Sequence, residues 1–208
     1  MVLLINACIP EKEQPTSDSV KVVISDRTFK IPKGYFDGRS PSGKDTESVV
    51  LEYSLPDFEV LPPHPIEREA RQELINKGLK KGMLLEAERN RPPIEVSAQN
   101  LMRGRNYQQQ EGGFYGLEKY QRPKSTGKYP TIWDDFFLEK DKDGKILGVL
   151  FCSPPNKDKN PGCNHTYMDK GLKYKIRWPI REFPNWKKQK QAAISFIDSL
   201  EIKKTEKE

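Results

Sequence analysis

The sequence predicts an α+β protein, with one antiparallel, β-rich domain, one internal helix and an amphipathic helix near the C-terminal end. Two observations favour this class. The chain has 208 residues, of which 35% are hydrophobic, enough to bury a core of its own. It also contains 17 prolines and 14 glycines, which favour short strands and frequent turns over a helical bundle.

Short runs of β-branched, aliphatic and aromatic residues between turn formers predict the strands. In chain order the expected strands are 20–24, 28–31, 48–53, 83–87, 94–98, 114–120, 133–138, 146–152, 165–168 and 172–178. Asp143-Gly144 and Asp169-Lys170-Gly171 indicate hairpin turns. Because strand side chains alternate, Tyr174, Ile176 and Trp178 are expected on one face of the last strand.

Two segments have helical rather than strand spacing. Apolar residues recur at near-helical intervals between Glu67 and Lys80, so an internal amphipathic helix is expected there. Near the end of the chain, Asn185 is placed to cap a second helix. One apolar stripe of that helix consists of Trp186, Ala193, Ile197 and Leu200.

The chain is expected to have three parts. Residues 1–19 are interpreted as a truncated lipoprotein signal and tether, residues 20–202 as a single α+β binding domain, and residues 203–208 as a charged tail. Ile5-Asn6-Ala7-Cys8 resembles the end of a bacterial lipoprotein signal, in which Cys8 would carry the lipid. No basic segment precedes it, so an edge strand of a cytosolic protein remains the alternative.

The other two cysteines lie on either side of a loop built almost wholly of turn-forming residues. Cys152 and Cys163 flank this loop, so we expect them to form a disulfide, which agrees with export to an oxidising compartment. Free thiols are one alternative. A metal site that adds His165 is another, although no C-x-x-C pair accompanies it.

The formal net charge of +6 favours an anionic partner, whether nucleic acid, lipid or an acidic protein. Nucleic acid is disfavoured because the basic residues are scattered among 30 acidic ones, and no segment resembles a basic aromatic platform or a zinc finger. The densest basic run, from Trp186 to Lys190, is interpreted as a solvated helix face.

No catalytic pattern is recognisable in the sequence. The histidines are His64 and His165, and there is no G-x-S-x-G, P-loop or dinucleotide-binding motif. Residues 139–146 resemble the start of a calcium-binding EF-hand loop, but Leu150 stands where that loop needs a bidentate Glu, so a hairpin turn is expected. The sequence therefore predicts a non-enzymatic protein with no cofactor and no metal.

Several short motifs together resemble a known family. They are the cysteine of Ile5-Asn6-Ala7-Cys8, Phe29–Phe36, Leu55–Phe58, the Cys152 and Cys163 pair, His165–Tyr167, Leu172–Ile176 and the Trp186 helix. The arrangement resembles small envelope lipoproteins that act as immunity proteins against type VI secretion lipase effectors. The resemblance implies a non-enzymatic periplasmic protein, anchored to the membrane by lipid, that binds and neutralises one cognate toxin.

The alternative functions are a general envelope accessory or substrate-binding lipoprotein, an enzyme with an unrecognised site, and a cytosolic binding module. For a toxin-binding protein we expect the interface in a segment with little strand or helix periodicity, because loops on a rigid sheet often carry function. Arg and Tyr are enriched in the hot spots of protein interfaces. The expected partner-binding residues are Arg103, Arg105, Tyr107, Phe114, Tyr115, Tyr120 and Arg122. The alternative is that these aromatic side chains fold back onto the core.

Overall fold

The computed structural model describes residues 18–36, 46–55, 57–61, 68–77, 80–87, 92–105, 107–121, 135–153 and 161–203. The strands are β1 (Ser19–Ile24), β2 (Arg27–Pro32), β3 (Ser48–Ser54), β4 (Lys80–Ala87), β5 (Gln108–Phe114), β6 (Leu117–Gln121), β7 (Asp135–Lys140), β8 (Ile146–Cys152), β9 (Gly162–Asp169) and β10 (Leu172–Pro179). The helices are α1 (Arg68–Asn76), α2 (Ile94–Arg105) and α3 (Trp186–Leu200), with short 3-10 turns η1 (Lys33–Tyr35) and η3 (Ile180–Asn185).

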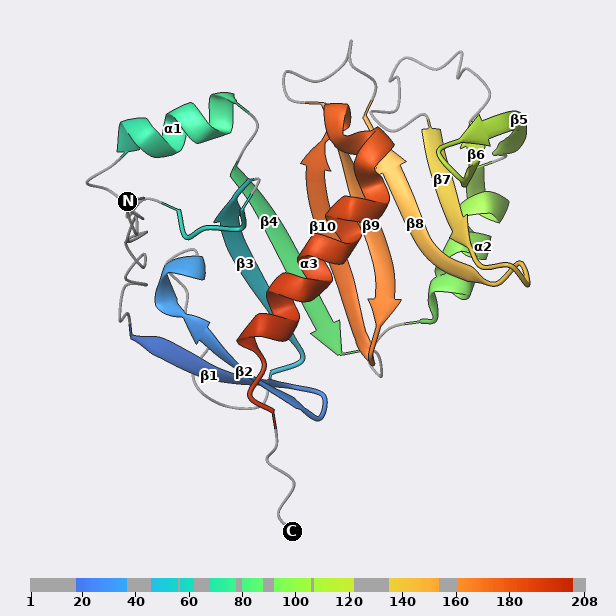
Figure 1. Ribbon diagram of the computed structural model, residues 1–208. Helices are drawn as coiled ribbons and strands as arrows, with labels where there is room; N and C mark the ends of the chain where they lie inside the picture. Colours follow the sequence, from blue (N-terminus) through green and yellow to red (C-terminus); the bar gives the residue numbers. More distant parts are fainter. Residues whose placement is uncertain are drawn as a thin grey trace, which may run out of the picture.

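Eight strands form one antiparallel sheet in the order β3-β4-β10-β9-β8-β7-β6-β5, so β3 and β5 are its edges (Figure 1). The C-terminal hairpin β9–β10 lies near the middle because β10 pairs with both β9 and β4. Strands β1 and β2 form a separate two-stranded sheet. The predicted α+β class, with a largely antiparallel sheet and a C-terminal helix, is therefore confirmed.

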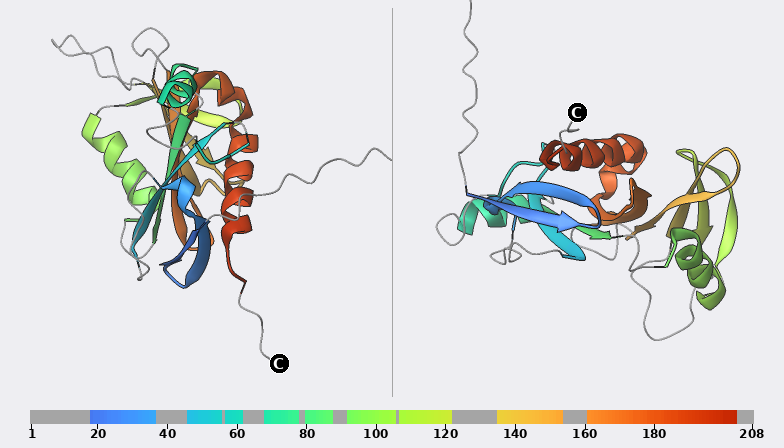
Figure 2. Two further views of the ribbon diagram at one scale, coloured as in Figure 1. Left: turned by 90° about the vertical axis from the view of Figure 1, so that its left-hand side faces the viewer. Right: turned by 90° about the horizontal axis from the view of Figure 1, so that it is seen from below.

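Helices α2 and α3 lie on opposite faces of the large sheet (Figure 2). On one face, α3 contributes Trp186 and Ile197 to the main core, together with inward side chains of β3, β4, β9 and β10. On the other face, α2 contributes Ile94 and Ala98 to a smaller cluster with residues of β7 and β8. The alternation expected for β10 is present, since Tyr174, Ile176 and Trp178 are all buried in the main core.

The segment predicted as a strand at Ile94–Ala98 is the first part of helix α2, so that prediction was wrong. Ile94, Ala98 and Met102 are four residues apart and all pack against the same cluster, which is helical spacing. The helix follows Pro92-Pro93, and proline is favoured at the start of a helix, where its missing N–H costs nothing. The run of five residues was too short to distinguish the two periods.

The segment of the expected partner-binding residues was predicted to have little periodicity, and this prediction was wrong for its described part. That part contains the end of α2 and the hairpin β5–β6. The expected strand 114–120 is interrupted at Tyr115-Gly116, where both residues have positive φ and form the hairpin turn. The Asp143-Gly144 turn between β7 and β8 is present, with the Asp141 carboxylate accepting the backbone N–H groups of Asp143 and Lys145. Trp133, expected in the strand before it, lies outside the described residues.

Asn185 occupies the N-cap position of α3, but its side chain does not cap the helix. The backbone N–H of Trp186 bonds to the carbonyl of Phe183, because η3 continues directly into α3. The Asn185 amide instead donates to the Glu182 carboxylate at 3.4 Å. The predicted apolar stripe of α3 is present: Trp186, Ala193 and Ile197 are buried and Leu200 packs against the core.

The β1–β2 hairpin is fastened to the C-terminal end of α3 by a buried arginine. The Arg27 guanidinium donates two hydrogen bonds to Glu201, at 2.9 and 2.7 Å, and one to Asp198 at 2.9 Å. Lys170, from the β9–β10 turn, also binds Asp198 at 2.7 Å. Beside this network, Phe29 of β2 forms a bridge with Glu201. The network therefore joins three elements that are distant in the sequence.

Candidate functional site

The expected partner-binding residues are divided between the two faces of the sheet. Tyr107 and Tyr120 pack against Phe136 in the cluster beneath α2, with ring centroids 4.5 and 4.9 Å away. The Tyr120 hydroxyl donates to Glu118, and burial together with this hydrogen bond raises the pKa of Tyr120 to about 12. Both rings are half-buried, so much of their surface packs against the protein itself.

On the α3 side, Phe114 is half-buried against the main core and Tyr115 is exposed. Arg103 is exposed on α2 and thus belongs to the opposite side of the sheet. The side chain of Arg105 and the whole of Arg122 lie outside the described residues. Tyr115 is therefore the predicted residue that combines a large aromatic ring with an exposed position, at 55% exposure.

Tyr115 lies beside the start of α3, in a surface that we call the α3 face. The α3 face consists of Tyr115, Arg181, Phe183, Lys187 and Lys188 and the hollow described below. The rings of Tyr115 and Phe183 meet edge to face with centroids 5.4 Å apart. Lys187 reaches the same turn, because a Cβ added at Gly116 would lie 3.5 Å from its Nζ. The turn that bears the exposed aromatic ring therefore also has a cation beside it.

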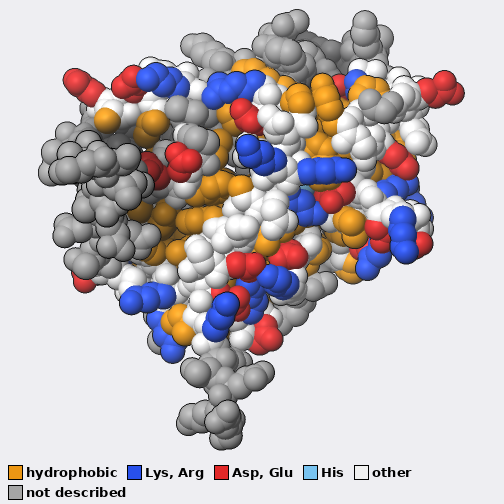
Figure 3. Space-filling view, in the orientation of Figure 1, with side chains coloured by type: hydrophobic (Ala, Val, Ile, Leu, Met, Phe, Trp, Pro, Cys, Tyr) orange, Lys and Arg blue, Asp and Glu red, His pale blue; other side chains and the backbone are white. Residues whose placement is uncertain are grey.

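A hollow of about 550 Å³ adjoins these residues on the other side of η3 and the start of α3. It is open to solvent, and Figure 3 shows hydrophobic side chains in the hollowed surface beside α3, with Lys and Arg side chains gathered nearby. The lining residues are Leu55, Asp57, Pro179, Arg181, Glu182, Asn185, Lys188, Gln189 and Ala192. The α3 face thus combines a basic rim, an apolar floor and an exposed tyrosine.

A disulfide lies in the part of the sheet that supports the α3 face. Cys152 of β8 and Cys163 of β9 form the predicted bond, so they are not available as free thiols or metal ligands. Next to it, the Ile180 N–H at the start of η3 donates to the Pro161 carbonyl at 2.9 Å. Trp178, two residues before Ile180, pairs with Cys163 across the β9–β10 ladder. The disulfide therefore joins β8 to β9, the strand that pairs with β10, and η3 follows β10.

A buried charged cluster, not predicted from the sequence, lies between the sheet and α3. The Nε2–H of His165 donates to the Glu139 carboxylate at 3.2 Å, and Lys190 binds both oxygens of the same carboxylate at 2.8 and 3.0 Å. The three residues come from β9, β7 and α3. The exposure of His165 is 0%, which assigns it to the interior. Its strand position was the signal available in the sequence.

The pKa values of His165 and Glu139 in this cluster are both lowered. Burial lowers the pKa of His165 to about 4 and outweighs the neighbouring Glu139 carboxylate, so the imidazole is neutral at neutral pH. Burial alone would raise the pKa of Glu139, but the hydrogen bonds from His165 and Lys190 lower it below its usual value. The Lys190 ammonium also lies 4.8 Å from the centre of the Tyr167 ring. A carboxylate, a lysine and a neutral histidine are thus held in a fixed arrangement.

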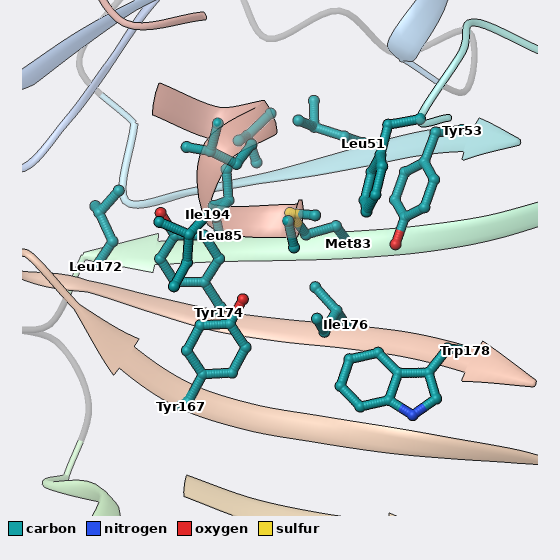
Figure 4. Packing of buried hydrophobic residues seen from close by; sticks show 14 of the residues in the cluster. Leu51, Tyr53, Met83, Leu85, Tyr167, Leu172, Tyr174, Ile176, Trp178 and Ile194 are labelled. Atoms are coloured by element: carbon teal, nitrogen blue, oxygen red, sulfur yellow. The ribbon is translucent and has the colours of Figure 1, made fainter. Parts of the chain in front are cut away.

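Gly148 of β8 makes room for this cluster. A Cβ at that position would lie 2.7 Å from His165 Nε2 and 2.8 Å from the Glu139 carboxylate. Around His165, the aromatic rings of Tyr167, Trp178 and Trp186 complete the wall, with centroids 4.7 to 5.7 Å away. Figure 4 shows Tyr167 and Trp178 among the packed side chains of the sheet. The Glu139 carboxylate is thus paired within the core, and the three residues are not an accessible acid–base pair.

Two further properties bear on what this protein binds. Among the described residues, no cluster of three or more His, Cys, Asp or Glu side chains is placed to hold a metal ion. Likewise, no helix in the described part of the chain is long and apolar enough to cross a membrane.

Comparison with known proteins gives a fold likeness. No family model and no curated protein matches the sequence. One similar structure is Smlt3025, an immunity protein of the Stenotrophomonas maltophilia type IV secretion system, with a TM-score of 0.64 and 16% identity over 89% of this chain and 94% of that one. Another is the Neisseria meningitidis iron-regulated outer membrane lipoprotein FrpD, with a TM-score of 0.51 and 10% identity over 88% and 92%. The chain therefore shares its fold with these two structures.

Proposed function

We propose that this protein is a non-enzymatic immunity protein that binds a secreted antibacterial toxin and neutralises it. The observation that carries the proposal is the fold shared with Smlt3025 over nearly the whole length of both chains. The α3 face supports it, because an exposed aromatic ring, an arginine and an open hollow on one surface are the composition of a protein-binding surface. The buried position of His165 agrees with a protein that carries out no acid–base chemistry.

The class of toxin is the narrower part of the proposal. The resemblance in the sequence pointed to type VI lipase effectors, whereas Smlt3025 belongs to a type IV secretion system. We therefore keep the proposal at a secreted antibacterial toxin, with a lipase as the specific case to test first. A lipase substrate assay with the purified toxin, with and without this protein, distinguishes that case from a toxin of another class.

We further propose a periplasmic location with a lipid anchor on Cys8, which lies outside the described residues. The Cys152–Cys163 disulfide supports an oxidising compartment. Expression of the natural gene in its own host, with and without the signal peptidase inhibitor globomycin, tests the anchor. A larger precursor is expected to accumulate with the inhibitor. A soluble cytosolic product of unchanged size would contradict both export and acylation.

The immunity proposal is tested by co-expression with secreted proteins encoded beside this gene. Each candidate toxin is directed to the periplasm of a bacterial host, with this protein exported to the same compartment. One candidate should be toxic alone and harmless when this protein is present, and the purified pair should form a stable complex. An exported, folded protein that rescues growth from none of the toxic candidates would reject the immunity function.

The FrpD likeness favours a second candidate function, that of an envelope accessory or substrate-binding lipoprotein. In that case the hollow beside α3 would hold a small molecule rather than a segment of a toxin. Deletion of the gene distinguishes the two. Loss of an immunity protein harms the cell only while the toxin gene is present, whereas loss of an accessory lipoprotein has the same effect with or without the toxin gene.

A further inference from the structure

The lysines at the start of α3 differ in burial and in ion pairing. Lys190 points inward, where Glu139 neutralises it. Lys187 and Lys188 are exposed, and no carboxylate within the described ranges forms an ion pair with either of them. The first turn of α3 also contains no acidic residue. Lys187 lies over the Trp186 ring, with its Nζ 5.5 Å from the ring centre. Cations near the start of a helix oppose the helix dipole, so the dipole explains neither lysine.

A third cation extends this basic rim. The Arg181 side chain is 59% exposed, and its contact with Glu182 is long, at 4.0 Å. Arg181 and Lys188 both line the hollow. Two carboxylates, Asp57 and Glu182, also line it, but Glu182 already accepts hydrogen bonds from the side chains of Asn185 and Gln189. The cations are therefore more available to a partner than the Glu182 carboxylate is.

The apolar parts of the α3 face are arranged around these cations. Leu55, Pro179 and Ala192 line the hollow, and Lys187 reaches Gly116, the residue after the exposed Tyr115. A partner that presented only carboxylates would leave the hollow unfilled, and an apolar partner would leave Lys187 and Lys188 without counter-charges. The surface matches a segment that carries both kinds of side chain.

We propose that the α3 face binds an acidic segment of the toxin, with carboxylates against Lys187, Lys188 and Arg181 and an apolar side chain in the hollow. This inference rests on the proposed function and names the chemistry of its partner. Charged groups at an interface mainly accelerate association and define the partner, while a buried apolar anchor mainly slows dissociation. The two parts of the face are therefore separable in a kinetic experiment.

The test uses the toxin that is neutralised in the co-expression assay and a pair of charge-matched variants. K187E/K188E reverses the basic rim, and K142E/K145E makes the same change of net charge at exposed lysines of the β7–β8 turn. Association rates are measured over a range of salt concentrations. K187E/K188E is expected to associate at least about 10-fold more slowly at low salt, with a weaker salt dependence, while K142E/K145E changes less than about 3-fold.

Circular dichroism checks that each variant is folded. The neutral variant K187Q/K188Q should associate at a rate between those of wild type and K187E/K188E. Equal rates for K187E/K188E and K142E/K145E would overturn the inference while complex formation leaves the immunity function intact. Failure to neutralise any toxin would reject the immunity function instead.

If no toxin is neutralised, a synthetic peptide can still test whether the α3 face binds an acidic segment. A peptide of alternating Glu and Phe, titrated at low salt, should shift the NMR amide signals of Tyr115, Arg181, Lys187 and Lys188 in the wild-type protein. Shifts confined to other residues, or no shifts, would overturn the inference. So would binding to phosphatidylglycerol vesicles that K187E/K188E loses and K142E/K145E keeps, because the face would then contact membrane lipid.

Discussion

The indole Nε1 of Trp186 donates a hydrogen bond to the backbone carbonyl of Tyr115 over 3.0 Å. This bond joins the first residue of α3 to the turn between β5 and β6, 71 positions earlier in the chain. Tyr115 has a φ of 56°, a left-handed conformation that costs a bulky residue free energy. The buried tryptophan therefore stabilises the turn that holds the exposed tyrosine ring against Phe183.

Replacing Trp186 by Phe should remove this hydrogen bond while keeping an aromatic ring in the core. We expect the free energy of unfolding to fall by about 1–3 kcal/mol, because the Tyr115 carbonyl loses its partner and a large buried side chain is shortened. Urea denaturation measures the change. The control is Y115F, which keeps the carbonyl and should unfold like wild type; a stable W186F protein would show that the bond contributes little.

Replacing Tyr115 by Ala should weaken toxin binding with little loss of stability, since the ring is more than half exposed. A typical aromatic hot spot contributes about 2 kcal/mol, or about 30-fold in Kd. Isothermal calorimetry with the neutralised toxin measures the affinity. The half-buried Tyr120, replaced by Ala, should lower stability instead because its ring stacks on Phe136. Wild-type affinity in a folded Y115A protein would place the interface elsewhere.

The buried His165 predicts a stability that declines in mild acid. The unfolded chain protonates this imidazole near its usual pKa of 6.5, but the folded protein does so only at about 4. Between these values the unfolded state binds more protons, so the free energy of unfolding falls as the pH is lowered. The gap between the two pKa values corresponds to about 3 kcal/mol in total.

H165Q should flatten this decline between pH 6.5 and pH 5, where carboxylates contribute little. The matched control is H64Q, which removes the other histidine of the sequence and should keep the slope. Chemical denaturation at a series of pH values gives the measurement. If wild type and H165Q lose stability in parallel over this range, the imidazole is not neutral in the folded protein.

Replacing Arg27 by Met should detach the β1–β2 hairpin from α3. Hydrogen bonds to charged groups contribute about 1.5–3 kcal/mol, and the partly buried guanidinium makes three of them, so a loss of at least about 2 kcal/mol at pH 7 is expected. The hydrogen bond from Arg27 lowers the pKa of Glu201. This carboxylate contribution is present above the usual pKa and is lost as the pH falls, so the difference between R27M and wild type should shrink below about pH 4.

K33M is the control for R27M, because Lys33 forms an exposed ion pair with Asp18 and such pairs contribute little. Its free energy of unfolding should change by less than about 0.5 kcal/mol. Equal effects of R27M and K33M would show that burial of the Arg27 network adds nothing.

Removal of the disulfide should destabilise the protein by about 3 kcal/mol on the loop-entropy estimate for its sequence separation of 11 residues. The variant C152S/C163S, compared with oxidised and reduced wild type, measures this effect by thermal unfolding. Reduced wild type should resemble the double variant. Peptide mapping without reduction checks the bond itself, and two freely alkylated cysteines in exported protein would contradict it.

The fold could be predicted from local signals where these are strong. The alternation in β10 and the apolar stripe of α3 could both be predicted, because the apolar residues of each segment recur often enough to define one period. At Ile94–Ala98 the apolar pattern fits both periods, and only the partner surface supplied by β7 and β8 makes the helix preferable. The decision there depends on tertiary packing.

The site was harder to predict for the same reason. Arg and Tyr composition identified Tyr115, but it did not distinguish this ring from those of Tyr107 and Tyr120, which pack against Phe136. Lys187 and Lys190 lie three residues apart in one basic run, and only the position of Glu139 on a distant strand makes one of them internal. Exposure depends on contacts between remote residues, and a single sequence does not contain them.

The β1–β2 hairpin forms its own ladder of backbone hydrogen bonds, separate from the eight-stranded sheet. A two-stranded sheet is marginal in water, so this one depends on its buried residues Ile24 and Phe29 and on the Arg27 network. Opening of the hairpin would expose the end of α3 without separating the central strands. The amide hydrogens of β1, β2 and the last turn of α3 should therefore exchange with solvent as one unit, before those of β9 and β10. The protein should therefore unfold in two cooperative units, the β1–β2 hairpin with the end of α3 and then the central strands, although both share one core.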